Sequence, residues 1–206
     1  ELRIANREGH GRNVGIICEH VLDLLNYPKK HRPELINIAA LHDIGKMLLP
    51  LEVLTKRGAL SLSEQHEYES HTLKGAQIVG NITGDRRAAT WIKHHHERFD
   101  GKGFPDRLKG NVIPYESRII YLCNQLEYLI RQYSQNEDVM DHLQRMAGKE
   151  LDPQLVWHIH AGTIAWLRQY VIHDDVPVTT ELSSVVRTDH HKPQQLESIT
   201  GGTKLL

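Results

Sequence analysis

The chain has 206 residues, enough for one domain with a substantial core. Its 25 Lys and Arg residues nearly balance 26 Asp and Glu residues, so overall charge gives no reason to expect binding to nucleic acid or to an anionic membrane. The composition, 39% hydrophobic and 6% aromatic, is ordinary for a soluble globular protein, but 15 histidines are unusually many and favour a metal site.

Cys18 and Cys123 each fall in an apolar helical pattern without a C-x-x-C spacing, so we expect buried thiols in a reducing compartment. No apolar run approaches the roughly 18 residues of a transmembrane helix, and no signal peptide is recognisable. We therefore expect a cytoplasmic protein. Because the chain begins with Glu1 and not with Met, we expect it to be a fragment of a longer protein.

Apolar residues at helical spacing predict amphipathic helices through most of the chain. Pro33 suits the first turn of the second helix, and Gly45 is expected to close it. Ser61 and Glu64 form a capping-box pattern at the start of the third. The expected helical ranges are 10–26, 33–42, 61–79, 86–97, 115–133, 138–147 and 153–170.

The fold class expected for residues 1–170 is therefore all-α, a bundle of about seven helices. Residues 47–60 are expected to be loop and short turns. Residues 100–114 are expected to be a loop, because Gly and Pro interrupt this stretch. Residues 171–206 contain short β-favouring stretches and predict a tail, a small hairpin or an arm exchanged between protomers.

Three consecutive histidines, 94–96, run into the carboxylates of Glu97 and Asp100, which favours a site for a hard or borderline metal. Adjacent residues on a helix diverge by about 100°, so two of these rings can face one metal only if the helix ends there. One of the three must then point away.

His42 and Asp43 form a second candidate, at the end of an apolar helix. The two oxygens of Asp43 could bridge two metals, and a carboxylate in apolar surroundings needs compensation. The alternative is a core histidine beside a capping aspartate. His71 and His10, taken singly, are more typical of core or surface histidines than of ligands.

Together these residues resemble the HD-GYP family, a branch of the HD phosphohydrolase superfamily. The resemblance rests on residues 41–46 (Leu-His-Asp-Ile-Gly-Lys), on His71, and on residues 95–105, where Gly-Phe-Pro stands for the family's Gly-Tyr-Pro. Residues 113–120 and 151–156 match further family segments, so that the resemblance covers about residues 1–165.

The resemblance implies an all-α HD-type bundle that holds two divalent metals, such as iron or manganese, and hydrolyses cyclic di-GMP to pGpG or GMP through a metal-bound hydroxide. It implies that Asp43 and Lys46 act in catalysis, with Lys46 on the substrate phosphate. The implied metal ligands are His10, His42, Asp43, which both metals share, His71, His95, His96 and Asn124. The implied substrate contacts, besides Lys46, are Gly103, Phe104, Pro105 and Glu127.

Two departures concern the metals and the substrate. Asn124 stands where the family has a ligand aspartate and offers only a neutral oxygen, which would weaken one metal or leave only one bound. Glu127 keeps a carboxylate at the second position of that motif, and Phe104 lacks the hydroxyl of tyrosine.

Three functions follow. The first is a cyclic di-GMP phosphodiesterase, impaired by Asn124 to some degree. The second is a catalytically weak module that binds the dinucleotide or a signalling partner, and the third is an HD phosphohydrolase for another nucleotide. Partners consistent with the resemblance are an upstream sensor domain, a diguanylate cyclase or a second copy of the chain, without nucleic acid and without a membrane segment in this fragment.

Overall fold

A computed structural model describes residues 9–171 of the chain. The tail predicted for residues 171–206 lies outside this range except for its first residue. The boundary near residue 170 therefore stays a prediction.

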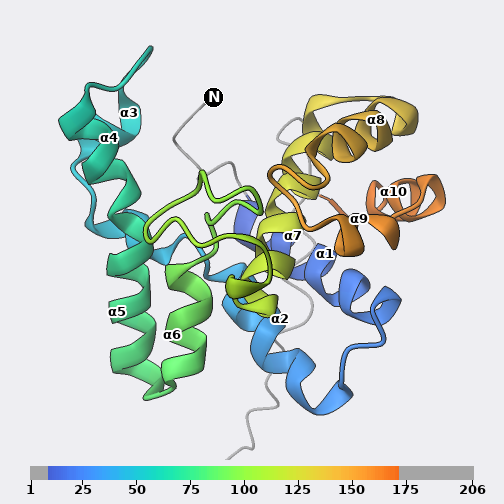
Figure 1. Cartoon of the computed structure of the whole chain (residues 1–206), viewed down its shortest axis with the longest axis horizontal. Coiled ribbons are helices and arrows are strands. Elements are labelled where there is room, and N and C mark those ends of the chain that lie inside the picture. The colour runs from blue at the N-terminus through green and yellow to red at the C-terminus, as the bar shows by residue number, and fades with distance from the viewer. Residues whose placement is uncertain (1–8, 172–206) are drawn as a thin grey trace, which may run out of the picture. The chain divides into compact units, whose positions relative to one another are not determined.

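Residues 9–171 are helical and contain no β-strand (Figure 1), which confirms the all-α prediction. None of the helices in this part of the chain is long and apolar enough to cross a membrane. The elements are α1 His10–Leu24, η1 Lys29–His31, α2 Arg32–Ala40, η2 Ile44–Leu48, α3 Leu51–Thr55, α4 Leu62–Glu69, α5 His71–Thr83, α6 Arg86–Lys93, η3 Gly110–Val112, α7 Tyr115–Gln132, α8 Asn136–Met146, α9 Pro153–Trp157 and α10 Ala161–Leu167.

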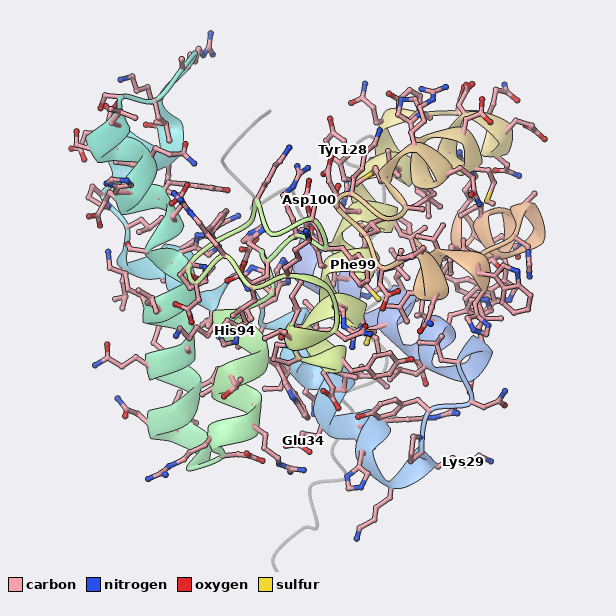
Figure 2. The ribbon with its side chains drawn as sticks, viewed as in Figure 1. Lys29, Glu34, His94, Phe99, Asp100 and Tyr128 are labelled. Carbon is pink, nitrogen blue, oxygen red and sulfur yellow. The ribbon has the colours of Figure 1, made fainter. Side chains whose placement is uncertain are left out.

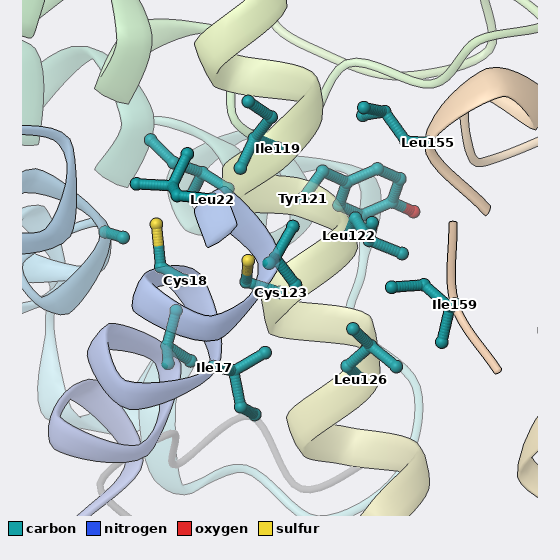
Figure 3. Close-up of a cluster of buried hydrophobic side chains, with 14 of the residues drawn as sticks. Ile17, Cys18, Leu22, Ile119, Tyr121, Leu122, Cys123, Leu126, Leu155 and Ile159 are labelled. Carbon is teal, nitrogen blue, oxygen red and sulfur yellow. The ribbon is translucent and has the colours of Figure 1, made fainter. Parts of the chain in front are cut away.

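Two amphipathic helices, α1 and α7, pack together and form the centre of the core. Their apolar side chains recur at helical spacing and are fully buried, among them Ile17, Leu22 and Leu122. Cys18 and Cys123 lie between the same helices (Figure 3) and are free, buried thiols, as predicted.

The helices α5 and α6 form an antiparallel pair, and α6 lies between α5 and α2 (Figure 1). Gly84 ends α5 in the left-handed conformation that favours glycine, with φ of 68°. Asp85 then begins α6 by accepting a 2.7 Å hydrogen bond from the backbone N–H of Arg87. This tight turn brings the start of α5 and the end of α6 to the same end of the pair.

Some helix boundaries differ from the prediction. The expected helix 61–79 is divided at Ser70, where Ser70, His71 and Thr72 each bond the carbonyl three residues earlier. Residues 47–60, expected as loop and short turns, include the end of η2 and the five-residue helix α3. The helix expected over 86–97 ends at Lys93.

Gly45 has a different role from the predicted helix cap. It lies in η2, and a Cβ built on it would be only 1.9 Å from the carbonyl oxygen of His71 and 2.5 Å from the backbone nitrogen of Gly75. The absence of a side chain therefore lets the segment after His42 and Asp43 lie directly against α5. This contact brings two of the predicted ligand segments together.

We predict that Gly45→Ala lowers the free energy of unfolding by about 3 kcal/mol, the upper part of the range for overpacking, because the clash is with backbone atoms. Thermal melting in the presence of a chelator measures this. Gly162→Ala is the matched control, since a Cβ there meets nothing within 4 Å and should leave the melting temperature unchanged or slightly higher. Equal melting of wild type and Gly45→Ala would contradict the close packing described here.

Candidate metal centre

Three histidines of the site are oriented by the same local hydrogen bond. His42 Nδ1 lies 2.8 Å from the carbonyl of Ala39, three residues earlier in the chain. The corresponding Nδ1 distances to the i−3 carbonyls are 2.6 Å for both His71 and His95. Because a carbonyl can only accept, each Nδ1 donates its proton to the carbonyl, and the Nε2 of each ring points elsewhere.

These rings converge on Asp43, which belongs to two groups of metal-binding side chains. The first group is His10, His42 and Asp43, and the second is Asp43, His71, His95 and His96. The ligand atoms of each group lie within 4.8 Å of one another.

The two oxygens of Asp43 divide between the groups. Oδ2 lies 3.3 Å from Nε2 of His42 and 3.7 Å from Nε2 of His10. Oδ1 lies 3.4 Å from Nε2 of His71 and 3.8 Å from Nε2 of His95. A carboxylate in this position can bridge two cations, one on each oxygen.

The second group contains buried polar atoms without hydrogen-bond partners: Asp43 Oδ1 and the Nε2 atoms of His71, His95 and His96. Leaving such atoms buried and unpaired is costly, about 1–3 kcal/mol each. A single cation would satisfy all four, because all four are lone-pair donors. Imidazole and carboxylate donors suit Fe, Mn, Zn or Ni, so the residues present fit the metal that the sequence predicts.

The protonation states also suit a cation. Burial, followed by the neighbouring charge of His95, lowers the pKa of His71 to about 3. Burial likewise lowers the pKa values of His95 and His96. Burial opposes ionisation of Asp43, but His42, His95 and Lys46 together hold its pKa well below the usual value. At neutral pH the second ligand group therefore offers the neutral imidazoles of His71, His95 and His96 around one carboxylate anion.

Lys46 lies beside this anion, with Nζ 2.7 Å from Asp43 Oδ2 and 5.4 Å from the centre of the Tyr68 ring. It is largely buried but lines the cavity that opens at the site. The ammonium group of Lys46 is thus placed where it can meet an anionic ligand.

Of the three consecutive histidines, His94 is the one that points away. The end of α6 at Lys93 lets His95 and His96 turn toward Asp43. His94 lies where the loop to α7 begins (Figure 2), and its Nε2 is 3.0 Å from Asp106 Oδ2.

The carboxylates of Glu97 and Asp100, which the sequence suggested as metal donors, are used within the loop instead. Glu97 is buried and accepts hydrogen bonds from the backbone N–H groups of Asp106, at 2.7 Å, and Leu108, at 3.0 Å. Asp100 accepts from Arg98 and from the backbone of Lys102. No feature of a single sequence distinguishes this use from metal binding.

The Gly103–Phe104–Pro105 segment folds back over the second ligand group. The Phe104 ring stacks on His96, with centroids 4.8 Å apart, and meets the edge of His71 at 6.1 Å. A Cβ on Gly103 would lie 2.5 Å from the His96 carbonyl, so glycine is required for this approach. The predicted contact of these residues with substrate stays a prediction.

The other two predicted residues lie on α7. Asn124 is half-buried one turn before Glu127, and its role as a ligand stays a prediction. Glu127 is 2% exposed, and its Oε2 lies 3.2 Å from Nδ1 of His10. Its Oε1 accepts a hydrogen bond from Arg131. The sequence placed Glu127 on the substrate and did not anticipate this contact with a candidate ligand.

A cavity of about 300 Å³ opens on the first ligand group, at the lower end of the range for small-molecule sites. Metal-binding side chains and Lys46 form one part of its wall, and apolar side chains form most of the rest. Its lining residues are His10, Gly11, Ala40, Leu41, His42, Asp43, Ile44, Lys46, Met47 and Leu54.

Comparison with known proteins places this geometry in a family. The sequence pattern of the HD domain family matches residues 2–155. The 3'3'-cGAMP-specific phosphodiesterase 2 of Vibrio cholerae is 29% identical over 165 residues, which cover 76% of this chain and 31% of that protein. The cyclic di-GMP phosphodiesterase of Thermotoga maritima is 27% identical over 163 residues, covering 76% of this chain and 44% of the other.

Solved structures show the same fold. A cyclic GMP-AMP-specific phosphodiesterase of Vibrio cholerae, V-cGAP3, superposes with a TM-score of 0.59 at 19% identity, over 82% of this chain and 47% of that one. The HDG"Y"P protein Bd1817 of Bdellovibrio bacteriovorus gives a TM-score of 0.59 at 21% identity, over 78% and 50%. The chain spans less than half the length of the two curated relatives. By its sequence match, its motifs and its fold, the chain belongs to the HD domain family, in the HD-GYP branch.

Proposed function

We propose that this chain is a metal-dependent phosphodiesterase that hydrolyses a cyclic dinucleotide, with cyclic di-GMP as the expected substrate and pGpG or GMP as products. The observation that carries the proposal is the pair of ligand groups that share Asp43 at the mouth of a cavity. Relatives named as cyclic di-GMP and 3'3'-cGAMP phosphodiesterases support the substrate class.

In the proposed reaction the oxygen of a water forms a bond to phosphorus, one P–O ester bond breaks, and the leaving sugar oxygen takes up a proton. One such step opens the ring to pGpG, and a second step on the remaining phosphodiester gives GMP. The histidines and Asp43 would hold the cations. Bound there, the cations would supply Lewis acidity and make a water more acidic, so that no serine or cysteine nucleophile is needed.

Lys46 is proposed to bind a phosphate oxygen of the substrate. Its Nζ lies within hydrogen-bond distance of Asp43, so it stands beside the shared ligand, and its side chain lines the cavity. Burial opposes its charge, but Asp43 and Tyr68 raise the pKa of Lys46, so the ammonium is kept. A fixed positive charge adds to the stabilisation of negative charge that develops on phosphorus oxygens.

The apolar part of the cavity is proposed to receive a base of the dinucleotide. Leu41, Met47 and Leu54 form this wall, and Met47 is 78% exposed. A flexible methionine side chain can cover the face of an aromatic ring. The volume of the cavity suits one nucleotide of the cyclic dinucleotide, with the second nucleotide outside the cavity.

Two other functions are less well supported. A catalytically weak binding module would bind the dinucleotide with one metal or none, yet both ligand groups are assembled. A phosphohydrolase for another nucleotide is less consistent with the relatives found. A sensor domain, a diguanylate cyclase partner, a homodimer and a cytoplasmic location stay predictions.

We predict that the purified chain loaded with Mn²⁺ or Fe²⁺ cleaves cyclic di-GMP or 3'3'-cGAMP, measured by chromatography of the products. Asp43→Asn removes the shared charge and should lower kcat by about a thousandfold, since metal ions contribute several kcal/mol of charge stabilisation. Asp141→Asn is the control, because Asp141 is exposed on α8 and pairs only loosely with Arg145 at 3.6 Å. Binding of the dinucleotide without cleavage, with one metal ion or none bound, would favour the binding module instead.

We predict that Met47→Ala raises KM for the dinucleotide about fivefold, through loss of about 1 kcal/mol of apolar contact, with kcat little changed. The control is Leu48→Ala, since Leu48 is also exposed, at 56%, but does not line the cavity. Hydrolysis of bis(p-nitrophenyl) phosphate, which has no nucleobase, reports on the metal site separately. If both variants show the wild-type KM for the dinucleotide, the base does not bind at this wall.

A further inference from the structure

His10 differs from the other oriented site histidines in the partner of its Nδ1. His42, His71 and His95 bond backbone carbonyls. His10 instead faces a carboxylate, with Nδ1 3.2 Å from Glu127 Oε2. The two residues come from different helices, α1 and α7, so the contact joins the first ligand group to the core.

Glu127 is itself held in place. Its Oε1 accepts a hydrogen bond from Arg131, one turn later on α7, and another from Asn13 Nδ2 at 3.4 Å. The side chains of Glu127 and Arg131 are 2% and 5% exposed. One oxygen is therefore bound by Arg131 and Asn13, and the other is aimed at His10.

The opposite side of the His10 ring faces the site. Its Nε2 lies 3.3 Å from His42 Nε2 and 3.7 Å from Asp43 Oδ2. A proton on Nδ1, donated to Glu127, leaves the Nε2 lone pair directed at the first ligand group. A carboxylate behind a ligand histidine fixes its tautomer and increases its basicity.

The contact between His10 and Glu127 is important in this chain because the two ligand groups contain little negative charge. Asp43 is the only acidic residue in the two ligand groups of the described chain, and both groups share it. Asn124, at the position where the family has an aspartate, adds no charge. The first group would thus bind its cation with two imidazoles and one carboxylate that it shares with the second group.

We propose that Glu127 is a positioning residue that acts through His10 to make the first ligand group bind its cation, with Arg131 holding it in place. This inference rests on the proposed metal-dependent function. It assigns Glu127 to the metal centre and not to direct contact with substrate. It also explains how the site can hold two cations despite Asn124.

The test is Glu127→Gln, which keeps the shape and removes the charge. Chelator-treated protein is titrated with Mn²⁺, and binding is monitored by calorimetry and electron paramagnetic resonance. The wild type should bind two ions whose electron spins are coupled to each other. The variant should keep one ion and bind the other 10- to 100-fold more weakly, which is the usual effect of losing such a partner. The coupled signal should be replaced by that of an isolated ion.

Two further variants separate this effect from a folding defect. Glu116→Gln makes the same change on the same helix, where Glu116 accepts a 2.9 Å hydrogen bond from Tyr27, and should bind both ions as the wild type does. Asn124→Asp added to Glu127→Gln should restore the second ion by supplying a charged ligand. A folding defect would not be repaired in this way.

Equal binding of both ions by Glu127→Gln and wild type would overturn the inference and leave the proposed function intact. The same holds if the wild type binds only one ion yet cleaves the dinucleotide, since Glu127 would then not compensate for Asn124. Failure of Asn124→Asp to restore the second ion would also overturn it. A wild type that binds no Mn²⁺ and cleaves nothing would contradict the proposed function itself.

Discussion

The hydrogen bond from a histidine Nδ1 to the carbonyl three residues earlier determines the form of this site. His42 follows the end of α2, His95 follows the end of α6, and His71 begins α5 directly after α4. At each place the carbonyl that the ring bonds lies in the last turn of a helix, where the regular bonding to the N–H four residues later ends. The same bond turns Nε2 away from the helix and toward Asp43, so ring orientation is a product of local structure.

Tertiary packing then brings these helix ends together. The turn at Gly84 makes α5 and α6 antiparallel, and Gly45 lets the segment after Asp43 lie against α5. The close packing of α1 on α2 depends on Gly11, where a Cβ would lie 2.5 Å from the carbonyl oxygen of Ala40. Small residues at these contacts, together with the apolar core, bring imidazoles from separate segments within reach of one carboxylate.

Much of the fold and of the site can be predicted from the sequence. Apolar periodicity identifies α1 and α7, and the family motif identifies His42, Asp43 and His71. The neighbours of each polar side chain are harder to predict, because they depend on where helices end. The sequence predicted the helix 86–97 four residues too long, although His95 and His96 could both face one metal only if the helix ended at these residues.

Glu97 and Glu127 show why the rest could not be predicted. Both are carboxylates in or near motif residues, and a carboxylate can bind a metal, a backbone N–H, a guanidinium or an imidazole equally well by its chemistry. In the folded chain Glu97 accepts from the loop backbone and Glu127 accepts from Arg131 and faces His10. Only the tertiary contacts, between residues as far apart as α1 and α7, select among these partners.

The most direct test of this account is anomalous X-ray diffraction from crystals of the chain grown with Mn²⁺. We expect two manganese peaks about 3.5–4 Å apart on either side of Asp43. One should lie against His10 and His42, and the other against His71, His95 and His96. Crystals with full Mn²⁺ in the solution but no peak between these side chains, or with peaks only at other surface histidines, would contradict it.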